Sequence, residues 1–188
     1  LPQREFRAGL AEVIKYGVIY DAKFFSRLER DLPMLLKRTD STLAATITRC
    51  CRIKAEVVAQ DEKESGLRTI LNFGHTIGHA LEAISRYGKY RHGEAISIGQ
   101  VAAAIISHEL IGLSTKDTTS IATIFERAGL PVNVKLSTAQ TRQLISAMRL
   151  DKKVSAGEIK FVLAKRIGKV ITGQTVSTKI IRQALNRK

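Results

Sequence analysis

Hydrophobic residues recur every three or four positions along most of the chain, which is the spacing of amphipathic α-helices. The first such pattern covers residues 4–19. Asp21 is placed to cap a second helix, and Pro33 is expected to interrupt that helix because proline removes a backbone hydrogen bond. The other amphipathic segments are residues 40–64, 115–128 and 138–149.

Two segments depart from this amphipathic pattern. Residues 94–110 are apolar on nearly every side, which predicts a helix buried all round and therefore packed by neighbours on several faces. Residues 159–173 alternate around Gly168, as in a β-hairpin. The predicted fold is mainly α: a multi-layer helical bundle with a small C-terminal β-hairpin, forming one domain over residues 1–188.

The balance of charged residues limits the classes of molecule that this chain is expected to bind. The chain has 31 basic and 17 acidic residues, a net charge of +14, which favours anionic partners such as nucleic acids or phosphorylated metabolites. The absence of tryptophan and the small number of aromatic residues argue against base-stacking surfaces, and no nucleic-acid-binding motif is present. Cys50 and Cys51 are adjacent and fit neither a disulfide framework nor a zinc ribbon, so we expect reduced thiols in a cytoplasmic protein. We expect that no apolar run reaches the length needed to span a membrane.

Some charged residues stand at positions that deserve an explanation. Lys54 falls on the apolar side predicted for the helix over residues 40–64. It should either meet an anion or extend its amine from the edge of that side into solvent. Glu12 and Lys15 are three residues apart, which is usually the spacing of a surface ion pair.

The segment LNFGHTIGHALEA carries His75 and His79 on one helical face. The spacing resembles that of H-E-x-x-H zinc helices, but the glutamate of that motif is missing. Gly74 and Gly78 would let another backbone or a ligand approach closely. His92 precedes the buried helix, whose N-terminus disfavours a protonated imidazole. Two histidines and a carboxylate can form a catalytic zinc site, and spacing alone leaves the choice of ligands open.

Three motifs occur in a fixed order: G-L-A-E-V-I-K at residues 9–15, R-x-x-x-N-x-G-H-x-x-G-H at residues 68–79, and H-G-E-A at residues 92–95. Together they resemble 3-dehydroquinate synthase over essentially the whole chain, as the C-terminal helical domain of that family. The resemblance implies that an N-terminal Rossmann-like NAD domain is absent from this chain. One departure is Gln100, where an apolar or small residue is usual for the family.

The resemblance assigns a role to each matched position. Glu12, His75 and His92 match the metal ligands, and His79 matches the histidine that transfers protons at the substrate. Lys15 matches a catalytic residue that also contacts substrate. The other substrate-binding positions are Lys54, Arg68, Asn72 and Lys152, with Lys153 as an alternative registration of the last.

The activity implied is a lyase reaction that converts 3-deoxy-arabino-heptulosonate 7-phosphate, a sugar acid phosphate, to 3-dehydroquinate and phosphate. It uses NAD catalytically and Zn²⁺ or Co²⁺, in a cytoplasmic homodimer without nucleic-acid or membrane partners. The isolated domain is expected to be inactive. Two alternatives are a metal-dependent polyol dehydrogenase or sibling sugar-phosphate cyclase, and a basic helical nucleic-acid-binding module. Lys54, Arg68 and His79 together favour the synthase.

Overall fold

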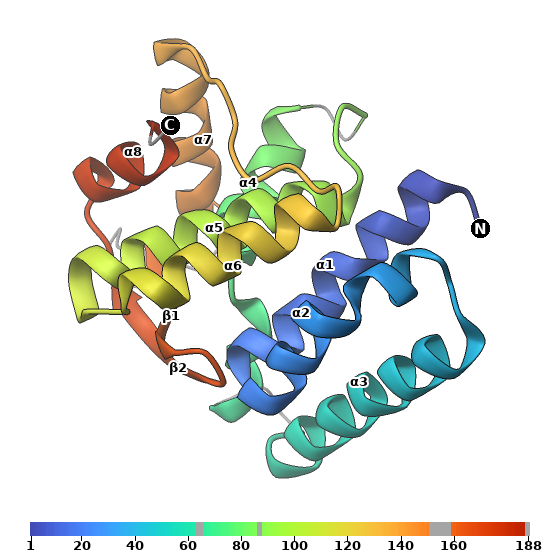
Figure 1. Ribbon diagram of the computed structural model, residues 1–188. Coiled ribbons are helices and arrows are strands. Elements are labelled where there is room, and N and C mark those ends of the chain that lie inside the picture. Colours follow the sequence, from blue (N-terminus) through green and yellow to red (C-terminus); the bar gives the residue numbers. More distant parts are fainter. Residues whose placement is uncertain (63–65, 86–87, 151–158, 187–188) are drawn as a thin grey trace.

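The computed structural model describes residues 1–62, 66–85, 88–150 and 159–186 (Figure 1). Helices dominate these ranges, and two strands form an antiparallel hairpin near the C-terminus, which confirms the predicted fold class. The elements in order are α1 (Gln3–Ile19), α2 (Ala22–Leu36), α3 (Asp40–Gln60), the 3₁₀ helix η1 (Leu67–Asn72), α4 (His75–Ile84), α5 (His92–Ile111), α6 (Thr115–Arg127), α7 (Thr138–Leu150), β1 (Lys160–Arg166), β2 (Lys169–Thr175) and α8 (Thr178–Asn186).

Helix α5 crosses the middle of the molecule, with α7 and α8 on one side and α1, α2 and α3 on the other (Figure 1). It contributes to two hydrophobic cores. Val101 and Ala104 pack into the core formed mainly by α1, α2 and α6. Ala102 and Ile106 pack into the core shared with α4, α7, the hairpin and α8. This double role explains why the α5 sequence is apolar on nearly every side.

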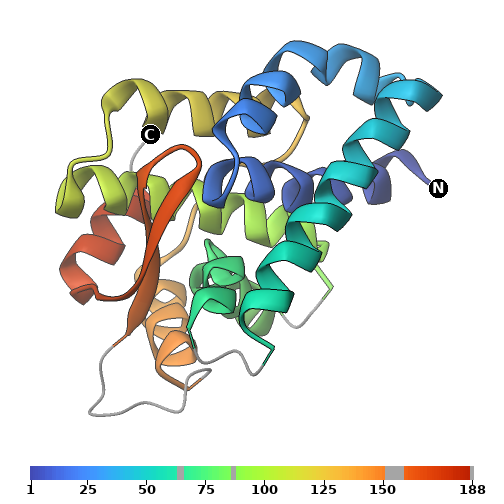
Figure 2. The same ribbon diagram turned by 90° about the horizontal axis from the view of Figure 1, so that it is seen from below.

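Hydrogen bonds to several helices anchor the hairpin, and two of them are short. Gly168, in the left-handed conformation at the turn, donates its backbone N–H to the carbonyl oxygen of Val18 over 2.8 Å. In β1, the N–H of Ala164 donates to the hydroxyl of buried Ser107 on α5, also over 2.8 Å. Figure 2 shows the hairpin and α3 on opposite sides of η1 and α4.

Helix α2 corrects the prediction made for Pro33. The helix continues through Pro33 to Leu36. A proline leaves the carbonyl four residues earlier without its helical donor. That carbonyl belongs to Glu29, and it accepts a hydrogen bond of 2.9 Å from the Arg127 guanidinium on α6. A tertiary contact thus replaces the missing backbone bond, and sequence periodicity could not reveal it.

Two boundaries also differ from expectation. Helix α3 ends at Gln60 rather than continuing toward Glu64, which lies outside the described residues. Helix α4 begins at His75, after Gly74 adopts a left-handed φ of 79°. The histidine helix is therefore preceded by a 3₁₀ helix that ends at Asn72. Helix α8 was not predicted.

The expectation that no apolar run reaches membrane-spanning length was wrong, because one helix meets the criteria of length and composition. Helix α5 has 20 residues and a hydropathy of 1.2, enough to cross a membrane on these two measures. However, 67% of the 18-residue apolar window within this helix is buried inside the domain. A buried core helix meets the same two criteria, and the two cores flanking α5 account for its apolar sequence.

Candidate metal and substrate site

Three helices bring a carboxylate and two imidazoles together. Glu12 lies on α1, His75 is the first residue of α4, and His92 is the first residue of α5. One potential ligand atom from each residue lies within 4.8 Å of the others. Glu12 Oε1 is 3.5 Å from His75 Nε2 and 3.8 Å from His92 Nε2. One carboxylate and two imidazole nitrogens form a donor set typical of catalytic zinc.

Glycines bring these helices close enough for the three side chains to meet. A Cβ at Gly93 of α5 would lie 1.9 Å from the carbonyl oxygen of Ala8 on α1. A Cβ at Gly99 would lie 2.1 Å from the carbonyl oxygen of Gly74, just before α4. Neither distance is possible for a real side chain. Backbone therefore packs on backbone at both crossings of α5, and the site lies where α1 and α4 meet its N-terminal end.

Two reciprocal ion pairs fix the start of α5 against α1. Arg4 binds both carboxylate oxygens of Glu94, with N–O distances of 2.6 and 2.7 Å. Arg91 pairs with Glu5 at 2.7 Å. Glu94 also accepts the backbone N–H of Arg91 over 2.9 Å, as in a capping box. These contacts hold the first turn of α5, which carries His92, at a defined position relative to Glu12.

The two oxygens of Glu12 have different surroundings. Oε2 accepts a hydrogen bond of 2.5 Å from the Lys15 ammonium. Oε1 is buried and accepts no hydrogen bond from the described residues. Burial acts to raise the pKa of Glu12, but the Lys15 charge and hydrogen bond prevail and lower it. A buried carboxylate oxygen that is ionised and unpaired, and that faces two imidazole nitrogens, has the surroundings expected of a metal ligand.

His75 presents its Nε2 atom to Glu12. Its Nδ1 atom is 3.2 Å from the carbonyl oxygen of Phe73, which can only accept, so Nδ1 carries the proton and Nε2 the lone pair. Burial, and then the charge of Lys15, lower the pKa of His75 to about 4. The ring is therefore neutral near pH 7, as a metal ligand must be.

His92 is held in a similar way by Glu82, a residue that the sequence analysis did not single out. The Nδ1 atom of His92 is 3.2 Å from each carboxylate oxygen of Glu82. Glu82 follows His75 by seven positions and His79 by three, so all three lie on one face of α4. That spacing is the signal that could have identified it. His79, Glu82 and His92 form a second group of possible ligands.

His79 lies beside the two other histidines. Its ring centroid is 5.1 Å from that of His75 and 6.0 Å from that of His92. It does not belong to the group that contains Glu12. A half-buried imidazole next to a metal-type site, but outside it, is well placed to exchange a proton with a bound ligand.

The two lysines differ from their expected environments. The Lys15 side chain is only 4% exposed and that of Glu12 is 36% exposed, so the pair is partly buried rather than on the surface. Burial lowers the pKa of Lys15, and the nearby charge of Lys54 lowers it further, against the opposing effect of Glu12. Lys54 is itself exposed, because the inner face of α3 carries Ile53 and Val57. The prediction that Lys54 lies on the apolar side of its helix was therefore wrong.

Two further predicted substrate residues, Arg68 and Asn72, lie on η1, the segment before α4. The backbone N–H of Arg68 donates to the Asp61 carboxylate over 2.8 Å, and its guanidinium donates to the Glu62 carbonyl oxygen over 3.1 Å. Asn72 lines a cavity of about 340 Å³ between η1 and the hairpin, together with Lys160. Lys152 and Lys153 lie outside the described residues.

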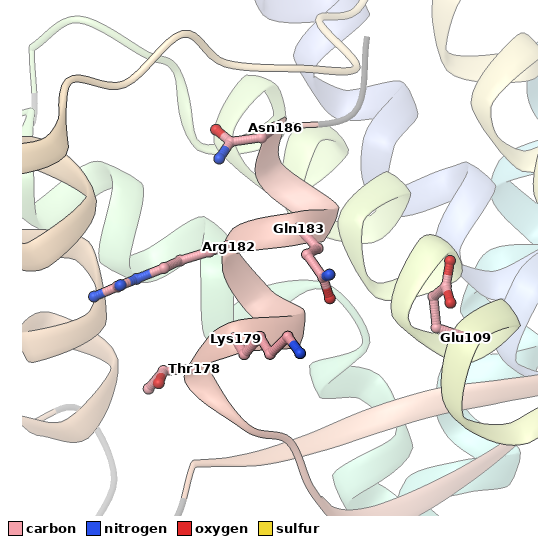
Figure 3. A pocket seen from close by; sticks show the side chains of 6 residues that line it. All are labelled: Glu109, Thr178, Lys179, Arg182, Gln183 and Asn186. Carbon is pink, nitrogen blue, oxygen red and sulfur yellow. The ribbon is translucent and has the colours of Figure 1, made fainter.

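A larger cavity, of about 630 Å³, lies at the other end of the domain along α8. Figure 3 shows Lys179 and Gln183 on the side of α8 that faces Glu109, whereas Arg182 points to the opposite side. The lining of this cavity contains none of the predicted site residues. The candidate site is therefore defined by the histidine cluster and not by the size of a cavity.

Solved structures of sugar-phosphate cyclases share this architecture. A 2-epi-5-epi-valiolone synthase from Streptomyces hygroscopicus subsp. jinggangensis, with NAD⁺ and Zn²⁺ bound, is 24% identical with a TM-score of 0.87, over 98% of this chain and 51% of that chain. A 2-deoxy-scyllo-inosose synthase complexed with carbaglucose-6-phosphate, NAD⁺ and Co²⁺ is 25% identical with a TM-score of 0.80, over 98% of this chain and 53% of that chain. This chain therefore has the fold of about half of each of these cyclase chains.

Sequence comparison identifies the family. The family model for the 3-dehydroquinate synthase C-terminal region matches residues 9–154. The chain is 46% identical over 186 residues to a 3-dehydroquinate synthase of Nitrosomonas europaea, covering 99% of this chain and 50% of the relative. It is 48% identical over 187 residues to one of Nostoc punctiforme, covering 98% and 51%. The chain belongs to the 3-dehydroquinate synthase C-terminal family and spans about half the length of these relatives.

Proposed function

We propose that this chain is the metal- and substrate-binding domain, residues 1–188, of a 3-dehydroquinate synthase. The complete enzyme would convert 3-deoxy-arabino-heptulosonate 7-phosphate to 3-dehydroquinate and phosphate, as a lyase. The observation that carries the proposal is the convergence of Glu12, His75 and His92 from three helices around the unpaired Glu12 Oε1. The high identity to named synthases supports the choice of reaction.

Glu12, His75 and His92 are the proposed metal ligands. The set of one carboxylate oxygen and two nitrogens suits Zn²⁺, and Co²⁺ accepts the same donors. Two cyclases of the same fold carry Zn²⁺ or Co²⁺ together with NAD⁺. When bound, the metal ion supplies Lewis-acid polarisation of the substrate alcohol. Lys15 would hold Glu12 ionised and oriented through its 2.5 Å bond to Oε2, which leaves Oε1 as the ligand atom.

His79 is the proposed proton-transfer residue, and Lys15 is the second catalytic group. The imidazole of His79 adjoins both metal-type histidines and would accept the proton of the alcohol that is oxidised. NAD supplies the hydride acceptor for this oxidation when it is bound. The buried ammonium of Lys15 offers further donors to substrate oxygens beside Glu12.

Basic and amide side chains around this site would bind the sugar acid phosphate. Lys54 is exposed, and its ammonium is close enough to Lys15 for its charge to lower the pKa of Lys15. Arg68 and Asn72 belong to η1, directly before the histidine helix. We also assign Lys152 to substrate binding, on the resemblance to the family alone. Charge-assisted hydrogen bonds from such groups to carboxylate and phosphate are strong, so these residues would also account for part of the positive charge.

The complete enzyme would contain a further NAD-binding domain of Rossmann type, because the chain spans only half of its relatives. We propose that this domain is required for turnover, that the full protein is a cytoplasmic homodimer, and that neither nucleic acid nor membrane is a partner. Family membership does not favour a polyol dehydrogenase or a nucleic-acid-binding module. The Arg68→Glu variant distinguishes the synthase from a polyol dehydrogenase, because only an enzyme that binds a phosphorylated substrate should lose substrate affinity sharply.

The first test is the metal content of the purified chain beside its Glu12→Ala, His75→Ala, His92→Ala and His79→Ala variants. About one zinc or cobalt ion per chain is expected in the unaltered protein and in His79→Ala, and none in the other three. Metal retained in the Glu12 variant but lost in the His79 variant would overturn the ligand assignment. Activity is then measured after the separate NAD domain is added, and His79→Ala should bind metal yet oxidise substrate slowly.

A further inference from the structure

We infer that Glu82 is a positioning residue that orients His92 and fixes its tautomer for metal binding. The inference rests on the metal site proposed above and deepens it. His92 is half exposed and stands at the first position of α5, so packing alone restrains its ring weakly. Its Nδ1 atom is 3.2 Å from both oxygens of Glu82, whose side chain is only 15% exposed.

The two histidines show the same arrangement, which supports this reading. In His75, Nδ1 contacts the Phe73 carbonyl oxygen and Nε2 faces Glu12 Oε1. In His92, Nδ1 contacts the Glu82 carboxylate and Nε2 faces the same Glu12 oxygen. In each case an acceptor on one side of the ring places the lone pair on the other side. The free imidazole has no such restriction and exchanges its proton between both nitrogens.

The carboxylate should also make His92 a stronger ligand. A negatively charged acceptor at Nδ1–H raises the electron density at Nε2, and such partners typically contribute 10–100-fold to metal affinity. A backbone carbonyl, as at His75, has no net charge. Glu82 therefore contributes both orientation and basicity to the more exposed of the two imidazoles.

A direct test uses Glu82→Ala and Glu82→Gln, with Glu109→Gln as the matched control. Glu109 lies on α5 but near its C-terminal end, in the cavity along α8. The probe is Zn²⁺ alone, with affinity measured by chelator competition on the folded chain. We expect Glu82→Ala to weaken zinc binding about 10–100-fold. The zinc affinity of Glu82→Gln, which keeps an acceptor but not the charge, should lie between those of Glu82→Ala and the unaltered protein. The zinc affinity of Glu109→Gln should equal that of the unaltered protein.

A second readout separates positioning from a general structural role. Nitrogen-15 NMR of the metal-free chain should show His92 protonated at Nδ1, and Glu82→Ala should shift the proton toward Nε2. The His75 tautomer should not change, because its acceptor is a backbone carbonyl. Circular dichroism verifies that each variant is folded. An unchanged His92 tautomer in folded Glu82→Ala would overturn the inference.

The outcomes distinguish this inference from the proposed function. If zinc binding requires Glu12 and His75 but is unaffected in Glu82→Ala, the metal site stands and the positioning role fails. If zinc binding requires His79 and Glu82 but not Glu12, the metal occupies the second group of ligands, and both assignments fail.

Discussion

Gly93 packs so tightly on Ala8 that a Cβ at position 93 would lie 1.9 Å from the Ala8 carbonyl oxygen. Helices α1 and α5 therefore touch through their backbones only four residues before Glu12 and directly after His92. The relative position of these two proposed ligands depends on that contact. A side chain at Gly93 would separate the helices and move Glu12 away from both imidazoles.

Gly93→Ala should therefore destabilise the domain by about 3 kcal/mol or more, because the inserted methyl has no space and the obstructing atoms are backbone. Bound zinc should be lost in any fraction that folds. Urea unfolding and metal analysis measure the two effects. Gly9→Ala is the control: it lies in the same helix as Ala8 with nothing within 4 Å of a Cβ, so it should gain about 0.5–1 kcal/mol. Equal stability of the two variants would contradict the backbone contact.

Gln100 carries an unpaired buried group that a substitution can remove. Its Nε2 donates to the Ala11 carbonyl oxygen over 3.0 Å, whereas its Oε1 is buried without a hydrogen bond from the described residues. Gln100→Met keeps a similar volume and removes the unpaired acceptor. We expect the free energy of unfolding to stay the same or rise by about 1 kcal/mol, measured by urea titration. A clear fall would mean that the bond to Ala11 outweighs the desolvation of Oε1.

The contact between Arg127 and the Glu29 carbonyl oxygen should depend on Pro33. In the unaltered chain, Arg127→Ala leaves that carbonyl without a donor and should cost about 1 kcal/mol. In a Pro33→Ala background the backbone N–H of residue 33 is available, so the same change should cost less. A double-mutant cycle by urea unfolding measures the difference. Arg30→Ala, which removes only an exposed pair with Asp31, should have no such coupling.

Stability at acid pH should depend on Asp21. Burial acts to raise its pKa, but the Phe24 N–H and the Arg49 guanidinium together lower it below the ordinary value of 3.8. Because the folded state holds the carboxylate ionised, the stabilisation is present above pH 3.8 and is lost as pH falls through the lowered value. Asp21→Asn keeps an acceptor for the helix cap but loses the charge.

Asp21→Asn should therefore lower stability by about 0.5–1 kcal/mol near pH 7, a modest amount because solvent screens the pair. The difference from the unaltered chain should close below pH 3.8. Urea unfolding at several pH values, on the metal-free chain, gives both curves. A difference that persists unchanged at pH 3 would mean that the side chain contributes through packing and not through its charge.

The sequence alone determined the helical character of the chain and the order of its site motifs. Periodicity indicates which side of each helix avoids water, so α1, α6, α7 and the mostly buried α5 were predictable. The hairpin followed from alternation around Gly168. The three motifs at residues 9–15, 68–79 and 92–95 indicated that Glu12, His75 and His92 belong together, by resemblance rather than by geometry.

Only the tertiary structure decided how those residues meet. The distance between helices depends on backbone contacts such as Gly93 on Ala8, which pattern along one helix does not encode. The same holds for Pro33, which stays helical because Arg127, distant in sequence, supplies a donor. Lys54 was misplaced because adjacent helix positions point in directions about 100° apart, so the buried Ile53 is followed directly by the exposed Lys54. The contact of Glu82 with His92 arises because the fold sets the face of α4 against the start of α5.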